Sequence, residues 1–152
     1  MKRRTFMLAI GAGATSAIGG TARAADAQQQ IFDLFTKIAA ALSDDDPAMF
    51  IEAVDPDMPN FQDFRRDIVA LTDLAAVTNS IEIVSDNGDD THRTEELDWF
   101  LEIVGSSDPH PVERRREVVK FKLERKGSKG KKWKIVSIDP LHYFRPPAEP
   151  RP

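Results

Sequence analysis

The sequence predicts an α+β domain in which three N-terminal helices pack on a curved, four-stranded antiparallel sheet. Three observations lead to this fold class. Apolar residues recur at spacings of three and four between residues 31 and 75, which is typical of helices with one buried face. From residue 77 onward apolar and polar residues alternate, which indicates half-buried strands. Short turns separate these strand segments, and strands joined in this way pair antiparallel.

The helical half divides into three segments. Residues 31–42 carry the first apolar face, and residues 47–54 form a short second helix that begins at a proline. Asp46 is expected to cap this second helix. Asn60 is expected to cap the third, in which phenylalanines and aliphatic residues repeat at helical spacing over 61–75.

The second half contains four strand segments, at 77–84, 96–103, 114–125 and 132–138. Turns at 86–90 and 126–131 and a loop at 105–111 connect them. In the second segment Trp99 lies on the apolar face, so Asp98 is expected on the polar one. A twisted sheet of this kind can curl around the helices and leave a conical cavity at one end.

The N-terminal residues resemble a twin-arginine export signal. The pair Arg3-Arg4 precedes a weakly apolar, glycine-rich run that extends to about Gly20. The run ends in a small-x-small cleavage pattern at 22–24, with Ala27 as the alternative position, and its low hydrophobicity favours this route over the general secretory one. We therefore expect a signal peptide at 1–24, one domain at 25–144, a Pro-rich tail at 145–152, and a periplasmic or secreted location.

Composition excludes several kinds of chemistry. The chain has no cysteine, which rules out disulfides, a thiol nucleophile and cysteine-ligated zinc or iron–sulfur sites. Acidic residues dominate 25–112 and basic residues dominate 113–138, within a formal net charge of −4. We interpret the basic segment as the polar face of a strand and expect no nucleic-acid partner and no membrane span.

The order of the elements resembles the nuclear transport factor 2-like superfamily, which has the cystatin-like cone fold. The resemblance covers most of 26–144. It depends on the short second helix with Phe50, the Phe-rich third helix and the closing strand at 132–138, which contains a basic-Trp-x-Ile pattern. It implies three helices on a cone-shaped sheet. The superfamily includes isomerases, dehydratases, hydrolases and ligand-binding proteins, and its enzymes generally place an Asp, a His or a Tyr inside the cone. No such set maps onto this sequence residue by residue.

Candidate site residues follow from the strand pattern and the cone. The candidates for lining a cavity are of two kinds. Five are aromatic residues on apolar faces: Phe61, Phe64, Trp99, Phe121 and Trp133. Two more, His142 and Tyr143, follow the last strand and can fold over the cone mouth. Simple core packing is the alternative use of the aromatic residues. The outer sheet face supplies the candidates for a dimer interface: Phe100, Val118, Lys120 and Lys122.

No catalytic residue, metal site or cofactor is assigned. The acidic residues between Asp86 and Glu96 do not match an EF-hand loop and are interpreted as a solvated turn. We expect an exported, non-catalytic domain that binds an apolar or mixed small molecule in the cone, or a protein partner such as a second copy through the sheet face. The alternative is an isomerase, dehydratase or hydrolase that uses His142, Tyr143 or a buried acid.

Overall fold

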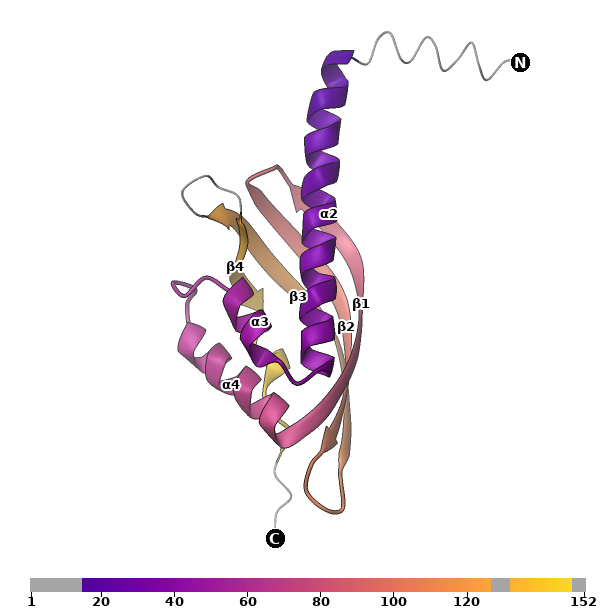
Figure 1. Cartoon of the computed structure of the whole chain (residues 1–152), viewed down its shortest axis with the longest axis vertical. Helices are drawn as coiled ribbons and strands as arrows, with labels where there is room; N and C mark the ends of the chain where they lie inside the picture. The colour runs from indigo at the N-terminus through magenta and orange to yellow at the C-terminus, as the bar shows by residue number, and fades with distance from the viewer. Residues whose placement is uncertain (1–14, 127–131, 149–152) are drawn as a thin grey trace, which may run out of the picture.

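The structure confirms three helices followed by a four-stranded antiparallel sheet (Figure 1). The computed structural model describes residues 15–126 and 132–148, and side chains of the first helix from Asp26 onward. The helices are α2 (Thr15–Ser43), α3 (Pro47–Ala53) and α4 (Phe61–Leu74). The strands are β1 (Ala75–Gly88), β2 (His92–Gly105), β3 (Val112–Lys126) and β4 (Lys132–Asp139), followed by a short 3₁₀ helix, η1 (Leu141–Phe144). Most of the predicted turn at 126–131 lies outside the described residues.

The sheet is a simple meander with strand order β1-β2-β3-β4. Its strands are longer than predicted, because the alternation of buried and exposed positions continues from the apolar runs into polar residues. β1 reaches Gly88, so residues 89–91 make a shorter connection than predicted. β1 has an extra residue, Val84, relative to β2, and β4 has an extra residue, Val136, opposite Lys122 and Leu123 of β3; these irregularities bend the sheet locally.

The helices cover one face of the sheet, and the sheet curls around α2 (Figure 1). The apolar faces of these elements meet in a core that holds fully buried aromatic rings: Phe35, Phe50, Phe64, Trp99, Phe121 and Phe144. Most neighbouring rings pack edge-on or tilted, as between Phe50 and Phe144, whose centroids are 5.0 Å apart at 87°, while Phe50 and Trp99 lie nearly parallel. The region inside the curved sheet is therefore filled by side chains where these rings meet.

Asn79 ties the first strand to the end of the first helix. Its side-chain amide donates to the carbonyl of Ala39 at 2.8 Å and to the hydroxyl of Ser43 at 2.9 Å. Its oxygen accepts a hydrogen bond from the indole nitrogen of Trp99 at 3.2 Å. One polar side chain thus satisfies three neighbouring groups and fixes how α2 crosses the sheet.

The first helix is longer than the predicted apolar segment. It begins at Thr15 and continues without a break past the cleavage position predicted after Ala24. Its N-terminal turns extend beyond the rest of the domain (Figure 1). Ala27 is the first buried residue among the described side chains. Within residues 15–126 and 132–148, no helix is long and apolar enough to cross a membrane.

The two predicted helix caps lie at the expected positions but make no side-chain capping bond. Asp46 precedes α3 and Pro47 begins it, yet the Asp46 carboxylate does not bond to the first turn. Asn60 precedes α4 with a φ of 62° and a ψ of 28°, which is the left-handed conformation. The cap residue normally has an extended backbone that directs its side chain at the first amides, and Asn60 lacks it. Asn60 instead tolerates a sharp turn before the helix.

Arg115 holds the C-terminal segment over the core. Its Nη1 donates to the carbonyls of Tyr143 at 2.9 Å and Arg145 at 2.6 Å. Its Nη2 donates to the carbonyl of Pro146 at 3.2 Å. The Tyr143 hydroxyl in turn contacts the carbonyls of Trp99 and Arg115. Burial raises the pKa of Tyr143 above its usual value, so the hydroxyl keeps its proton and can donate it.

Replacing Tyr143 with Phe tests this connection. The ring is kept, but two buried carbonyls lose the single hydroxyl proton that they share, so we expect the free energy of unfolding to fall by about 1–2 kcal/mol. Urea denaturation measures the change. His142→Ala, at the adjacent exposed position, is the control and should change the free energy by less than about 0.5 kcal/mol. Equal stability of Tyr143→Phe and the parent protein would contradict the role given to the hydroxyl.

Candidate functional site

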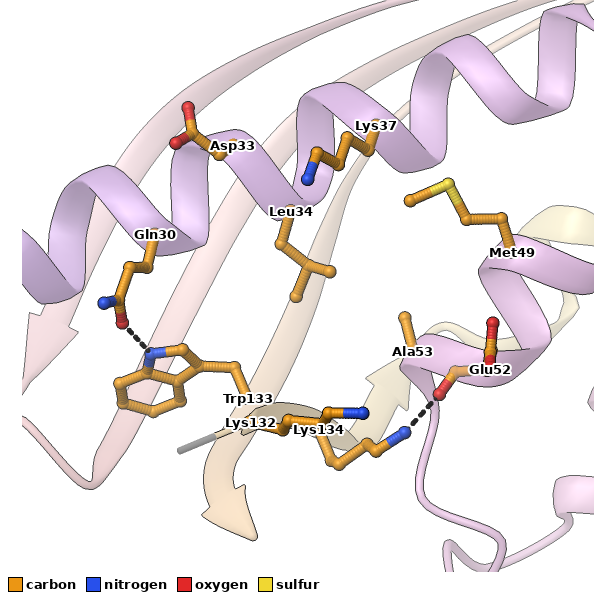
Figure 2. Close-up of a pocket in the computed structure, with 10 residues that line it drawn as sticks. All are labelled: Gln30, Asp33, Leu34, Lys37, Met49, Glu52, Ala53, Lys132, Trp133 and Lys134. Carbon is orange, nitrogen blue, oxygen red and sulfur yellow. Dashed lines mark hydrogen bonds between the residues drawn. The ribbon is translucent and has the colours of Figure 1, made fainter. Parts of the chain in front are cut away.

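An open cleft of about 540 Å³ lies between α2, α3 and β4. Figure 2 shows the side chains that line it. They are Gln30, Asp33, Leu34 and Lys37 of α2, Met49, Glu52 and Ala53 of α3, and Lys132, Trp133 and Lys134 of β4. A volume of this size is within the range of small-molecule sites in proteins.

Local structure explains why these residues meet. The four residues of α2 are spaced by three or four and therefore share one face of the helix. The segment after α3 attaches to β4 through an isolated parallel bridge between Val54 and Ile135. The amide of Asp55 also donates to the carbonyl of Ile135 at 2.8 Å. These bonds fix the far wall of the cleft relative to β4.

Trp133 is held in place from two sides. Its indole nitrogen donates to the side-chain oxygen of Gln30 at 2.9 Å (Figure 2). The same oxygen accepts from Arg125 at 3.0 Å, and the Arg125 guanidinium lies 4.8 Å from the centroid of the Trp133 ring. The indole is thus fixed by a hydrogen bond and a cation–π contact before any ligand is present.

The lining combines an apolar wall with charged side chains. Leu34, Met49, Ala53 and Trp133 supply apolar surface, and Lys37, Lys132 and Lys134 supply ammonium groups. Lys134 donates to the backbone carbonyl of Glu52 (Figure 2). Such a lining suits a molecule with an apolar body and a polar group.

The predicted cavity residues are distributed between this cleft and the core. Trp133 lines the cleft, while Phe64, Trp99 and Phe121 lie fully buried among the core rings. Phe61 is half-buried at the edge of that core. His142 is exposed, and Tyr143 is buried under the C-terminal segment. Sequence reasoning missed the cleft residues of α2 because a polar helix face normally faces solvent.

The predicted interface residues share the sheet face that points away from the helices. Phe100 is half-buried there, and Val118, Lys120 and Lys122 are exposed. On the same face, Arg116 of β3 forms an ion pair with Asp98 of β2 at 2.7 Å. This ion pair lowers the pKa of Asp98, which lies on the polar face as the sequence predicts. Acidic side chains of β2 therefore face basic side chains of β3 across the outer surface.

A buried carboxyl group on the inner sheet face was not predicted. Glu95 is fully buried. As an ionised carboxylate, which can only accept hydrogen bonds, it would have no partner for either oxygen. It occupies the same face of β2 as Leu97 and Trp99, two and four residues away. The strand alternation could have identified it, but its position among acidic residues suggested a solvated turn.

Glu95 is the neutral member of a small charged cluster. Burial and then the neighbouring Asp86 carboxylate raise the pKa of Glu95 to about 8. Arg93 opposes this shift but lies closer to Asp86, with its Nε 3.0 Å from Asp86 Oδ1 and 3.6 Å from Glu95 Oε1. A protonated Glu95 can donate a hydrogen bond to Asp86, which accounts for one of its two unpartnered oxygens.

The acidic connection between β1 and β2 is explained by its own hydrogen bonds. Asp89 accepts hydrogen bonds from the amides of Thr91 and His92 at 2.8 Å each, which lower its pKa to about 2. Gly88 has a φ of 135°, and a Cβ there would lie 2.2 Å from the carbonyl oxygen of His92. Within the described residues, no group of three or more potential metal ligands converges.

Glu95→Gln tests the protonation state of the buried carboxyl. The folded protein holds this proton at pH values where the unfolded chain, with a pKa near 4.5, has released it. The free energy of unfolding should therefore fall as pH rises from about 4.5 to 8, by up to about 4 kcal/mol. Glu95→Gln should remove this part of the pH dependence in urea denaturation. Glu96→Gln, on the opposite strand face, should retain it. An unchanged pH profile for Glu95→Gln would rule out the assignment.

Comparison with known proteins places this geometry in a fold family. No family model and no curated protein matches the chain. A crystal structure of a protein from Novosphingobium aromaticivorans, provisionally named an aromatic ring hydroxylase, matches with a TM-score of 0.60 at 12% identity. The match covers 74% of this chain and 86% of that one. A nuclear transport factor 2-like superfamily protein from Salmonella enterica serovar Typhimurium matches with a TM-score of 0.58 at 10% identity. It covers 76% of this chain and 89% of that one.

At such low identity these similarities concern the fold alone. Together with the order of the elements, they confirm the prediction made from the sequence: the chain has the cone-shaped α+β fold of nuclear transport factor 2-like proteins.

Proposed function

We propose that this chain is an exported binding domain whose cleft between α2, α3 and β4 takes a small molecule with an apolar body and a polar group. The observation that carries this proposal is the cleft itself, about 540 Å³ in volume, with apolar side chains from α2, α3 and β4 and ammonium groups from α2 and β4. Preorganisation supports it, because Trp133 is already fixed by Gln30 and Arg125 and does not need to be ordered when a ligand binds.

The packing of the cone interior also favours the cleft. Three of the aromatic residues predicted to line a cavity, Phe64, Trp99 and Phe121, are fully buried in the core. The ring centroids of Trp99 and Phe121 lie 5.9 Å apart. A ligand at that position would have to displace buried rings, at a cost of several kcal/mol for each large side chain. The cleft offers apolar surface without that cost.

Binding through the outer sheet face is a second proposal. The acidic side chains of β2 and the basic side chains of β3 would be complementary to those of a second copy turned by a two-fold rotation. Val118, 47% exposed, would lie near the centre of such a contact. The homodimer stays a prediction, which sedimentation velocity at low and high salt can check.

The enzyme alternative has one specific observation in its favour. A carboxylic acid with a pKa near 8 suits proton transfer at neutral pH, and Glu95 is such a group. Its oxygens are buried, however, and a substrate would need an opening of the sheet or of α2 to reach them. His142 and Tyr143 contribute less, since one is exposed and the hydroxyl of the other contacts two backbone carbonyls. We therefore rank binding above catalysis.

A paired substitution tests the cleft. The variant Leu34→Gln with Met49→Gln makes the apolar wall polar, and we expect it to weaken binding of the neutral dye N-phenyl-1-naphthylamine about tenfold. Fluorescence titration measures the change. The matched control, Val84→Gln with Val118→Gln, makes the same kind of change at exposed positions outside the cleft and should leave binding unchanged. Unsaturable dye binding, or equal loss in both variants, would contradict the proposal.

A second substitution tests export. Replacing Arg3 and Arg4 with Lys keeps the charge but removes the arginine pair, and we expect the precursor to accumulate in the cytoplasm of a bacterial host. Immunoblots of the cytoplasmic and periplasmic fractions show the distribution. Arg23→Lys, next to the predicted cleavage position, is the control. Undiminished periplasmic protein in the double variant would exclude the twin-arginine route.

A further inference from the structure

The lysines of the cleft indicate what kind of polar group the ligand carries. Lys37 comes from α2, Lys132 comes from β4, and both side chains are exposed at the cleft. Among residues 26–126 and 132–148, no carboxylate lies within 4.0 Å of either ammonium. The third lysine, Lys134, is already bonded to the carbonyl of Glu52. Two cations therefore border an apolar wall without an anionic partner from the described part of the chain.

The acidic residues of the cleft do not neutralise these cations directly. One oxygen of Asp33 accepts a hydrogen bond from Gln29, one turn earlier on α2, at 2.9 Å. Figure 2 shows the chain of Lys37 turned toward Leu34, and the carboxylate of Asp33 turned away from both. Elsewhere, basic side chains such as Arg114 and Arg116 pair with acids across the sheet. The cleft lysines thus remain available in a chain whose formal net charge is −4.

We propose that the ligand of the cleft is an amphipathic carboxylate, with its anionic group between Lys37 and Lys132 and its apolar body on Leu34, Met49 and Trp133. This inference rests on the proposed function of the cleft and narrows the class of ligand. An anion in the cleft can form a charge-assisted hydrogen bond with either flexible lysine and is attracted by the other, and it displaces no ion pair of the described residues. The apolar side chains beside the lysines can cover the apolar body of the same ligand, so one molecule gains both kinds of contact.

The outer sheet face offers a matched comparison within the same molecule. Lys120 and Lys122 are also exposed, two residues apart on β3, but they lie on the sheet face away from the cleft. Replacing Lys37 and Lys132 with Gln, or Lys120 and Lys122 with Gln, changes the net charge of the protein equally. A difference between the two variants therefore reports on position and not on total charge.

The test compares dodecanoate with dodecan-1-ol, which has the same chain length and no charge, by isothermal titration calorimetry on the full chain. We expect dodecanoate to bind at least about tenfold more tightly than dodecan-1-ol. The variant Lys37→Gln with Lys132→Gln should lose this preference and still bind the alcohol. The variant Lys120→Gln with Lys122→Gln should keep the preference. Thermal unfolding of both variants checks that they fold.

The outcomes separate this inference from the function on which it rests. Equal affinity for the acid and the alcohol would overturn the carboxylate and leave the apolar binding site standing. Failure of both compounds to bind would overturn both proposals. A loss of preference that is the same in the two lysine variants would show long-range attraction instead of a site, and would also overturn the inference.

Discussion

The packing of this domain depends on Trp99, in the second of the four strands. Its ring contacts one aromatic side chain from each of four other elements: Phe35, Phe50, Phe121 and Phe144. Its indole nitrogen bonds to Asn79 of β1, and its carbonyl accepts from Tyr143. Trp99 therefore connects the helices, the sheet and the C-terminal segment to one another. Because interiors are close-packed, the positions of these elements cannot be changed independently.

This dense core determines where the molecule can bind something else. Aromatic rings occupy the space inside the curved sheet, so open volume remains where α2 and α3 meet the edge strand β4. The side chains there are partly apolar and partly charged, because the face of α2 that borders the cleft is only partly buried. Gln30 illustrates this position, since it is itself exposed but bonds to the buried Trp133, while its neighbour Ile31 is completely buried.

The sequence predicted the parts of this structure that depend on local periodicity. The helices at 47–54 and 61–75 and all four strands were found within a few residues, since each repeats one apolar face. The missing capping bonds of Asp46 and Asn60 could not be foreseen, because residue type does not determine the backbone angles of a turn. Glu95 was missed because its sequence neighbours are acidic, although its strand position is that of a core residue. The cleft could not be predicted, because its lining comes from α2, α3 and β4, and the sequence does not show that these distant segments lie side by side.

The position of the Arg115–Tyr143 connection in the chain has a consequence for the timing of folding. Tyr143 and Phe144 complete the packing around Trp99. Phe35 contacts the same ring, but in the sequence it lies near the start of the domain, far from these two residues. Such contacts close a long loop, and they can form only after the last of their residues has been synthesised. A nascent chain that stops before η1 exposes the apolar surface of Trp99 and its neighbours. The domain therefore folds as a unit after its C-terminal residues have been synthesised, and not progressively from its N-terminal helix.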